Sequence, residues 1–411
     1  MKLKEKNNAV EVSLALVQIK ESPVSFWIDS SGGPQNLCKN SFYGINPKYY
    51  IYGSLNEINF VSCCSRDTRP GRFYVNCFDF LEEKIREEKH NPNGIFVGYF
   101  AYGVSDFFFA YFEEVFNVIA RSDSDKAISE RYKTASSILS EPPHNDKLYS
   151  NMTDSEYLEK VKQIKAEIKA GNVYQVNLTR EYSIQIQDAD DLELYLKLRL
   201  ASPNPYGCYF KTPFLSILSS SPEEFLYADL QKGYIRTRPI KGTLPKNNFD
   251  IDPKNQAENI MIVDLERNDL GRICEYGSVK VKKLLEIESY KHLNHIVSTV
   301  EGKLKSNISL REIFEAIFPG GSITGAPKIA AMKIIEKIEP TKRGAYTGTF
   351  GYIKTDETMD FNILIRTIFV NDGKTTFNIG GGIVADSEPE SELEEINLKA
   401  KGIMSALCLS S

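Results

Sequence analysis

Glutamates on two predicted helices are the first side chains in this sequence that suggest chemistry. Glu392 and Glu395 lie three residues apart beside an apolar stripe of helical period, so both would project from one helix face. Glu258 lies early in a second predicted helix, which begins at Asp252. If the two helices face each other, these carboxylates supply the hard oxygen ligands that suit Mg²⁺. The alternative is a solvated face on which Glu395 pairs with Lys399 at i,i+4.

A lysine and a glutamate near two strand ends form a candidate nucleophile and acid. Lys241 lies between Pro239, which fixes the backbone, and Gly242, which leaves space around it. A lysine at a strand end is usually a solvated charge, but a desolvated lysine has a lowered pKa and becomes a nucleophile. Glu223, in a Ser-Pro-Glu segment, would act as a general acid if burial raises its pKa.

His295 and Arg366 complete the candidate polar residues. Arg366 lies within an apolar run, residues 361–370, that is predicted to be one strand. The Asp-Gly turn that follows and the second run, 375–383, predict a β-hairpin. Because an unpaired guanidinium inside a strand would be costly, Arg366 is expected to meet a carboxylate.

Two glycine-rich segments offer bare backbone to a ligand. Residues 319–328 look like a phosphate loop, but Ala326 stands where that loop needs lysine, and Pro327 interrupts the amides. The segment instead precedes a predicted helix, whose N-terminus can receive a carboxylate, although a plain tight turn is the alternative. One side of this helix is predicted to carry Ile329, Met332, Ile335 and Ile338. In the second segment, Gly380–Gly382, a strand exposes its backbone, which often marks the close approach of a ligand.

Composition and charge exclude several classes of protein. The 411 residues are 42% hydrophobic and 26% charged, with a net charge of -5 and no basic stripe, so a nucleic-acid partner is not expected. The seven cysteines are scattered and form no CxxC, which argues against a disulfide framework and a zinc site. No apolar stretch reaches the length of about 18 residues that spans a membrane, so a cytoplasmic protein is expected.

The predicted elements favour an α+β fold. Residues 1–20 are expected to form a strand, and a polar stretch, residues 121–152, is the candidate boundary between an N-terminal segment, 1–145, and a main unit, 150–411. Thr153 and Glu156 form a capping box at the start of a helix that ends at Gly171. Long strands mix with separate helices without a regular βαβ rhythm, which argues against a doubly wound sheet.

Five ordered motifs resemble the chorismate-utilising enzymes. They are Ser-Pro-Glu (221–223), Arg-Pro-Ile-Lys-Gly-Thr (238–243), Ala-Glu-Asn-Ile-Met-Ile-Val-Asp-Leu-Glu-Arg-Asn-Asp (257–269), Phe-Pro-Gly-Gly-Ser-Ile-Thr-Gly-Ala-Pro-Lys (318–328) and Gly-Gly-Gly-Ile-Val-Ala-Asp-Ser (380–387). The resemblance covers residues 154–407 strongly and 26–102 more loosely. It implies layered antiparallel β-sheets packed face to face with helices outside, and an N-terminal segment interwoven with the catalytic unit. Family members that form anthranilate, isochorismate or salicylate typically carry alanine where Lys241 stands, so the resemblance is closest to the branch that aminates chorismate at C4.

The resemblance also assigns roles to residues. Lys241 would attack C2 of chorismate, Glu223 would protonate the departing hydroxyl group, and ammonia would add at C4. Mg²⁺ would be held by Glu258 and Glu395, with Glu392 nearby. The substrate would be held by His295, Thr243, Thr324, Tyr346, Arg366 and the amides of Gly381 and Gly382. No Cys-His-Glu glutaminase signature surrounds any cysteine, so a separate glutaminase subunit is expected to supply the ammonia. The alternative within the family is formation of anthranilate and pyruvate.

Two departures from the family pattern are visible. Asn255 stands three residues before Glu258, where relatives usually carry an acidic residue, so the predicted metal site has one carboxylate fewer. The Leu-Leu-Glu-Ser motif of tryptophan feedback is absent near the N-terminus, although a tryptophan pocket near Asp29, Ser30 and Pro205 remains an alternative.

Overall fold

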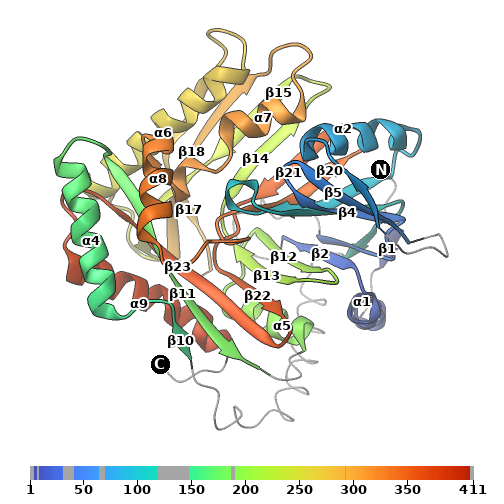
Figure 1. Cartoon of the computed structure of the whole chain (residues 1–411), viewed down its shortest axis with the longest axis horizontal. Coiled ribbons are helices and arrows are strands. Elements are labelled where there is room, and N and C mark those ends of the chain that lie inside the picture. Colours follow the sequence, from blue (N-terminus) through green and yellow to red (C-terminus); the bar gives the residue numbers. More distant parts are fainter. Residues whose placement is uncertain are drawn as a thin grey trace.

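Two large β-sheets form the centre of the molecule (Figure 1). The computed structural model describes residues 4–6, 9–30, 41–63, 70–118, 148–186, 190–291 and 293–407. The first sheet has 11 strands, in the order β1 (Lys4–Lys6), β9 (Phe116–Val118), β3 (Ser41–Ile45), β2 (Ser25–Asp29), β12 (Tyr206–Lys211), β13 (Ser216–Ser221), β22 (Thr367–Asn371), β23 (Lys374–Ile383), β11 (Gln175–Gln185) and β10 (Tyr149–Ser150), with β19 (Gly325–Ala326) also paired to β11.

The second sheet has 12 strands. Their order is β16 (Ile240–Pro245), β18 (Leu293–Lys303), β15 (Tyr234–Arg238), β14 (Glu224–Asp229), β21 (Thr358–Asn362), β20 (Thr349–Lys354), β7 (Ile95–Phe100), β8 (Phe107–Phe112), β4 (Tyr49–Ser54), β5 (Glu57–Ser62) and β6 (Gly71–Phe73), with β17 (Lys280–Ser289) also paired to β18. Strands from the N-terminal part of the chain pair with strands much further along it in both sheets, since β2 pairs with β12 and β7 pairs with β20. Figure 1 shows β2 beside β12. Apart from the β1–β9 pair, the ladders are antiparallel.

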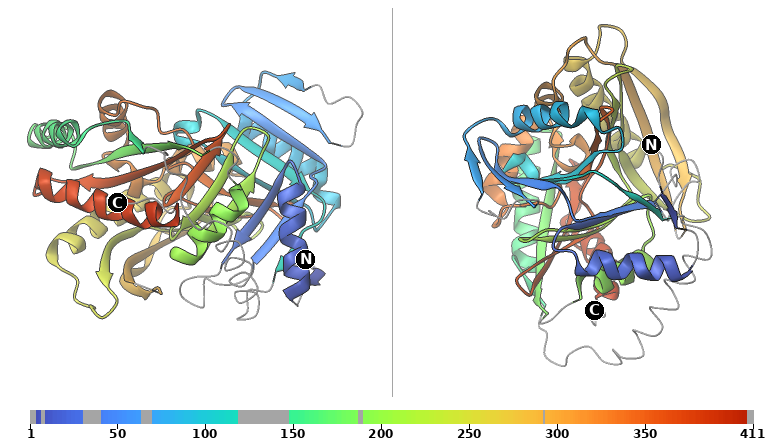
Figure 2. Two further views of the ribbon diagram at one scale, coloured as in Figure 1. Left: turned by 90° about the horizontal axis from the view of Figure 1, so that it is seen from below. Right: turned by 90° about the vertical axis from the view of Figure 1, so that its right-hand side faces the viewer.

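Eight α-helices surround the sheets in the described residues (Figure 2). They are α1 (Ala9–Glu21), α2 (Cys77–Glu87), α4 (Asp154–Lys169), α5 (Asp191–Ala201), α6 (Pro253–Ile273), α7 (Leu310–Ile317), α8 (Lys328–Ile338) and α9 (Pro389–Ala406). Short 3₁₀ turns occur at η1 (Glu88–His90), η2 (Tyr102–Val104) and η3 (Gly321–Ile323). The capping box at Thr153 and Glu156 is confirmed, with the Glu156 N–H donating to Thr153 Oγ1 at 3.2 Å.

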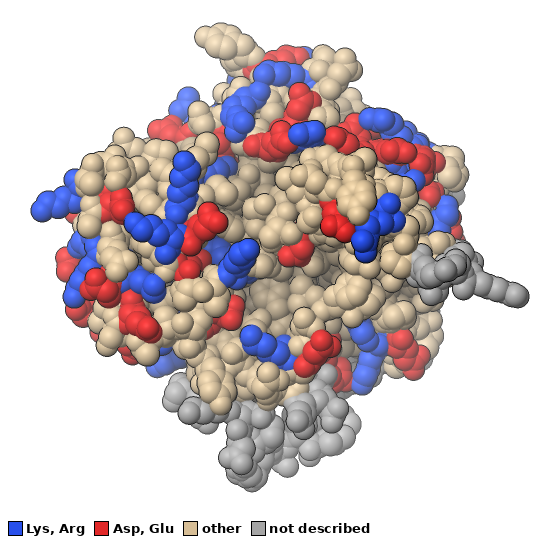
Figure 3. Space-filling model, viewed as in Figure 1, with Lys and Arg blue, Asp and Glu red and all other residues tan. Residues whose placement is uncertain are grey.

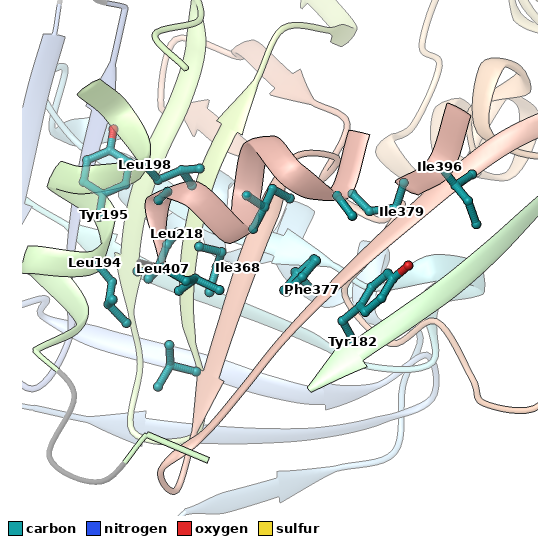
Figure 4. Packing of buried hydrophobic residues seen from close by; sticks show 14 of the residues in the cluster. Tyr182, Leu194, Tyr195, Leu198, Leu218, Ile368, Phe377, Ile379, Ile396 and Leu407 are labelled. Carbon is teal, nitrogen blue, oxygen red and sulfur yellow. The ribbon is translucent and has the colours of Figure 1, made fainter. Parts of the chain in front are cut away.

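Three apolar clusters hold these layers together. In the first, side chains of α4, α5 and α9 pack on the first sheet. Figure 4 shows Leu407, which follows α9, beside Ile368 of β22, and Ile396 of α9 near Ile379 of β23. A second cluster joins α2, α6 and α7 to the second sheet. The third lies between the sheets, where the ring centroids of Phe108 and Phe210 are 5.7 Å apart. The α+β class and the face-to-face sheets predicted from the sequence are therefore confirmed.

Two of the crossings between the sheets carry candidate site residues. The chain leaves β13 for β14 through residues 222–223, and it returns from β21 to β22 through residues 363–366. The two crossings touch, because the Ile363 N–H donates to the Glu223 carbonyl oxygen at 3.1 Å. Polar side chains on both crossings are thus brought to the junction of the sheets.

Two sequence-based expectations about these elements are wrong. Residues 9–21 form helix α1 rather than a strand. The run 361–370 is not one strand, because it divides between β21 and β22, and Arg366 lies in the break with a φ of 51°. The predicted boundary near residues 121–147 lies outside the described residues, so the division into 1–145 and 150–411 stays a prediction. A helix long and apolar enough to cross a membrane does not occur in the described segments.

Candidate active site

Glu223 and Lys241 are joined through one backbone contact. Glu223 is 3% exposed at the crossing from β13 to β14, and its Oε1 accepts a hydrogen bond from the Ile240 N–H at 3.2 Å. Ile240 precedes Lys241 at the start of β16, the edge strand of the second sheet. The sheet junction therefore holds the predicted acid beside the strand that carries the predicted nucleophile.

Burial moves both groups toward their neutral forms. It raises the pKa of Glu223 above its ordinary value, although the Ser322 hydroxyl and the Ile240 N–H oppose this by bonding the carboxylate. It lowers the pKa of Lys241, against the opposing charges of Glu258 and Glu223. Among the described residues, no carboxylate lies within ion-pair distance of the Lys241 amine. A neutral lysine there keeps its lone pair for attack.

Gly242 is required for this conformation of the lysine segment. Its φ is 95°, and an added Cβ would lie 2.6 Å from Ile296 Cδ1 and 2.9 Å from Asn255 Oδ1. Asn255 thus packs against Gly242, and its amide also bonds Asp252, the N-cap of α6. The residue that departs from the family pattern therefore serves the start of α6 and the lysine segment.

His295 is a neutral acceptor that faces Arg366. Its Nε2 lies 3.5 Å from Arg366 Nη2, and its Nδ1 lies 3.2 Å from Thr243 Oγ1. Since a guanidinium only donates, Nε2 is the acceptor and Nδ1 carries the proton. Burial, reinforced by the Arg366 charge, lowers the pKa of His295 to about 3. The described residues provide no carboxylate within ion-pair distance of Arg366; its guanidinium bonds His295 instead, and the charge of Glu223 acts on it from further away.

The glycine-rich loop, residues 319–327, folds against the same junction. Thr324 is fully buried and donates from Oγ1 to the Gly320 carbonyl at 2.9 Å, while the Gly321 N–H donates to Glu266 Oε1 at 3.2 Å. The helix that follows, α8, begins at Lys328 with Pro327 as its N-cap. Its buried side differs from the predicted one, because Ile329 is 71% exposed and the buried residues are Ala331, Ile335 and Ile338.

A buried ion pair fastens this loop to β11. Arg343 donates to Glu339 Oε1 at 2.8 Å, to the Ile323 carbonyl at 2.9 Å and to the Asn177 carbonyl at 3.0 Å. Both charged side chains are almost fully buried, with exposures of 2% and 4%. The pair therefore fixes the distance between the loop and the strand.

Replacing Arg343 with methionine should destabilise the protein strongly. The change leaves the Glu339 carboxylate buried and unpaired, which costs about 3–5 kcal/mol. Urea unfolding of Arg343→Met should show a lower midpoint, and the double variant Arg343→Met/Glu339→Gln should recover much of the loss. A double variant as unstable as the single one would contradict this account.

The three glycines of β23 lie where this strand loses a neighbour. In the described structure β22 pairs with β23 only as far as Phe377, whereas β11 follows it to Ile383. In an antiparallel ladder, pairs of directly opposite residues alternate. The residues of one pair exchange both N–H···O bonds, and the residues of the next pair point their N–H and C=O groups away from each other. The Asn177 N–H donates away from β23, to Thr324 O at 2.8 Å, so its partner Gly382 also points its N–H to the open edge.

The same alternation places Gly380 and Gly381 differently. Thr179, the partner of Gly380, donates its N–H to Glu339 Oε1 at 3.0 Å, so Gly380 also faces the open edge. Gly381 pairs with Leu178 inside the ladder. The geometry therefore favours the amides of Gly380 and Gly382 as ligand contacts, rather than the predicted Gly381 and Gly382. Tyr346 is buried nearby, with its hydroxyl 3.4 Å from where a Cβ on Gly380 would lie.

The predicted metal glutamates face the lysine from two helices. Burial raises the pKa of Glu258 on α6, and the charges of Glu392 and Glu395 on α9 add to this rise. Burial also acts on Glu395, but Lys399, at 2.6 Å, and other lysines outweigh it and hold the pKa of Glu395 below its ordinary value. The predicted i,i+4 pair of Glu395 with Lys399 is thus formed, and the three carboxylates still share one electrostatic neighbourhood.

This donor set fits Mg²⁺ by its chemistry. All three groups supply oxygen. Burial raises the pKa of Glu258 most, and a divalent cation would relieve the additional repulsion from Glu392 and Glu395. Glu392 is held by the Ser387 hydroxyl at 2.6 Å and lies 3.6 Å from the Lys254 amine. As the side chains stand, no three His, Cys, Asp or Glu residues of the described chain are grouped closely enough to hold a metal ion. Water and a substrate carboxylate would have to complete the coordination.

Figure 3 shows one face of the molecule hollowed near its centre, with acidic and basic side chains around the hollow. A separate cavity of about 460 Å³, lined by residues such as Leu230, Lys303 and Leu310, contains none of the candidate residues. At the predicted tryptophan pocket, Asp29 is buried and bonded to Arg199 and to the Tyr195 hydroxyl.

These features define an α+β enzyme with a partly buried lysine and a buried acid at the junction of two sheets. Residues 56–405 match the family described as chorismate binding enzyme, so the chain belongs to that family.

Relatives with different names are similar to the chain to the same degree. Component 1 of aminodeoxychorismate synthase from Bacillus subtilis is 41% identical over 269 residues, which cover 63% of this chain and 57% of the relative. Component 1 of anthranilate synthase from Synechocystis is 42% identical over 279 residues, covering 63% and 55%. The matches therefore span somewhat more than half of these relatives. The structure of anthranilate synthase component I from Streptococcus pneumoniae superposes with a TM-score of 0.72 at 24% identity, covering 98% of this chain and all of that one, which shows the fold.

Proposed function

We propose that this chain is component I of an aminodeoxychorismate synthase, which aminates chorismate with ammonia to give 4-amino-4-deoxychorismate for para-aminobenzoate and folate synthesis. Overall identity does not separate this function from anthranilate formation, because relatives of both names match equally well. The observation that carries the proposal is Lys241. Burial lowers its pKa, and its strand is held by the buried acid Glu223. Family members that form anthranilate, isochorismate or salicylate typically carry alanine at this position.

The proposed reaction proceeds in two displacements. Neutral Lys241 attacks C2 of chorismate, the ring double bond shifts, and the C4–O bond breaks as Glu223 gives its proton, so that the hydroxyl group leaves as water. The attached amine then passes its extra proton to the Glu223 carboxylate. Ammonia adds at C4, the double bond shifts back, and the C2–N bond breaks as Glu223 returns that proton to the nitrogen of Lys241. The new ammonium group at C4 then gives a proton to Glu223, which restores the starting acid. Chorismate and ammonia thus give aminodeoxychorismate and water, through two steps easier than one direct displacement.

Charged and polar groups of the chain would orient the dianionic substrate. Arg366 and the N–H groups of Gly380 and Gly382 are donors for its carboxylates, and Arg366 is itself oriented by neutral His295. Mg²⁺ held by Glu258, Glu392 and Glu395 would neutralise a substrate carboxylate and withdraw electrons from the ring. Without such a cation, these glutamates would repel the substrate.

A separate glutaminase subunit is proposed as the source of ammonia. The relatives named as component 1 of aminodeoxychorismate synthase support a two-component system. In a direct assay, ammonium salts would replace that subunit.

Product analysis tests the proposal. Purified protein, incubated with chorismate, Mg²⁺ and ammonium, should form 4-amino-4-deoxychorismate, identified by mass, and EDTA should stop the reaction. Anthranilate with pyruvate would assign the chain to the alternative branch. Isochorismate formed without ammonium would overturn the amination as well, and full activity in EDTA would remove Mg²⁺ from the proposal.

A further inference from the structure

The strand that carries Lys241 departs from its regular ladder at the lysine. Ile240 of β16 pairs with Val297 of β18. The next pair is Thr243 with His295, so two residues of β16 lie opposite one residue of β18. Such a bulge leaves backbone groups without ladder partners. The ladder alone therefore does not fix the backbone of Lys241, although a nucleophile must be held in one orientation toward its substrate.

Asn259 of α6 supplies the contact that the ladder lacks. It is 1% exposed, and its Nδ2 lies 3.4 Å from the carbonyl oxygen of Lys241. The same Nδ2 lies 3.4 Å from the carbonyl oxygen of Ile296, the β18 residue opposite the bulge. Because a carbonyl oxygen only accepts, the amide turns its N–H groups to the bulge and its Oδ1 away from it. One side chain thus ties the backbone of Lys241 to β18.

Ser298 of β18 fixes the orientation of this amide. It is 0% exposed, and its Oγ donates to Asn259 Oδ1 at 2.5 Å and accepts the Leu285 N–H at 3.1 Å. Its own N–H donates at 3.2 Å to the carbonyl oxygen of Pro239, two residues before Lys241. A buried polar network whose members all have partners rigidifies the structure around it. The bulge is therefore held in one conformation by α6 and β18 together.

Asn259 also relates the lysine to two other candidate site residues. On α6 it directly follows Glu258, whose charge acts on Lys241. On β18, Ile296 directly follows His295. A displacement of the Asn259 amide would therefore shift the lysine relative to both a predicted metal ligand and the histidine.

We propose that Asn259 is a positioning residue, which orients the side chain of Lys241 for attack on C2 by holding the Lys241 carbonyl group in the bulge. The inference rests on the proposed function, because it needs Lys241 as the nucleophile. The carboxylate contacts proposed for chorismate come from Arg366 and from β23, so loss of Asn259 should slow the covalent step without weakening binding. A purely structural role would lower stability and leave kcat unchanged.

Asn259→Leu is the test, because leucine has a similar size but no group that can bond the Lys241 carbonyl oxygen. In this variant kcat for amination should fall about 10²-fold, the loss expected from a displacement of about 1 Å, while KM for chorismate stays near its wild-type value. The covalent adduct that forms with chorismate in the absence of ammonium should appear more slowly by the same factor, as followed by intact mass.

Two variants of Ser298 test the network without removing Asn259. Ser298→Ala frees the amide to turn, so kcat should fall by a smaller factor at unchanged KM. Ser298→Thr keeps the hydroxyl group and suits a strand, so it should restore most of that loss. If Asn259→Leu fails to fold, this pair of variants decides the inference.

Asn204→Leu is the matched control for stability. Asn204 is also buried, and its Nδ2 donates to the carbonyl oxygens of Ser202 and Ser220 at 3.1 and 2.9 Å, away from the bulge. This variant should lower the melting temperature and keep the wild-type kcat. Wild-type kcat and adduct formation in Asn259→Leu would overturn the inference, and so would an equal loss of kcat in Asn204→Leu.

The experiment also separates this inference from the proposed function. If the wild-type protein converts chorismate into another product, the proposed function fails, whereas the ratio of kcat values for that product still decides whether Asn259 acts on the site. Hydrogen exchange requires no turnover at all. The amides of residues 241–243 should exchange faster in Asn259→Leu than in the wild type and Asn204→Leu, and equal rates in all three proteins would overturn the inference.

Discussion

Replacing Lys241 with alanine is expected to lower kcat for amination by about 10³-fold or more, because the variant has no group that can carry the covalent step. Chorismate binding should persist, since the proposed carboxylate contacts come from Arg366 and from the glycines of β23. Steady-state assays with ammonium give the loss in kcat, and the chorismate-induced rise in melting temperature reports binding.

Two further variants separate nucleophilic from electrostatic action of Lys241. Lys241→Arg keeps a positive charge but is a poor nucleophile, so it should be as inactive as Lys241→Ala. Lys282→Ala, which removes an exposed lysine of β17, should behave as wild type. When the wild-type protein is incubated with chorismate and no ammonium, its intact mass should increase by the mass of chorismate less one water. Substantial activity of Lys241→Arg would exclude the covalent step, and substantial activity of Lys241→Ala would exclude any essential role.

Local patterns in the sequence predict elements well where one face of an element is apolar and its ends carry standard capping residues. The helix after Thr153 and the Asp-Gly turn of the β22–β23 hairpin are confirmed for this reason. Residues 9–17 were ambiguous, because a short apolar run suits a buried strand and a helix alike. The break at residues 363–366 could not be predicted, because Ile363, Leu364 and Ile365 continue the apolar run of the strands on either side.

The candidate site was predictable as a set of residues but not as an arrangement. Motifs identify Glu223, Lys241 and Arg366, and only the two sheet crossings explain why they meet. The burial of one face of β11 could not be predicted, because Gln175, Asn177 and Thr179 make that face polar, and in a sequence a polar face looks like a solvent-facing side. That face is in fact buried under the glycine-rich loop, and burial of this kind depends on a segment about 150 residues further along the chain.

Replacing Glu223 with glutamine is expected to lower kcat/KM by about 10²–10⁴-fold, the usual contribution of a general acid. The wild-type profile should be bell-shaped, because the reactive form needs a neutral Lys241 and a protonated Glu223. The requirement for neutral Lys241 makes activity rise with pH, and the requirement for protonated Glu223 makes it fall as pH increases further. Burial lowers the pKa of Lys241 and raises the pKa of Glu223, which brings the two requirements closer together in pH.

Glu223→Gln removes the titration that makes activity fall at high pH, so the falling limb of the pH profile should disappear. Glutamine keeps the size of the side chain and accepts the Ile240 N–H as before, so the fold should persist. The residual activity should rise with pH and then level off, because only the Lys241 requirement remains. Glu224→Gln is not a suitable control, since Glu224 is buried and pairs with Arg236 at 2.8 Å. Glu286→Gln is a suitable one, because Glu286 is only partly buried and loses only a surface pair with Lys283. A Glu223→Gln variant that keeps a falling limb at high pH would show that another group donates the proton, and Glu223 would then act only by holding β16 in place.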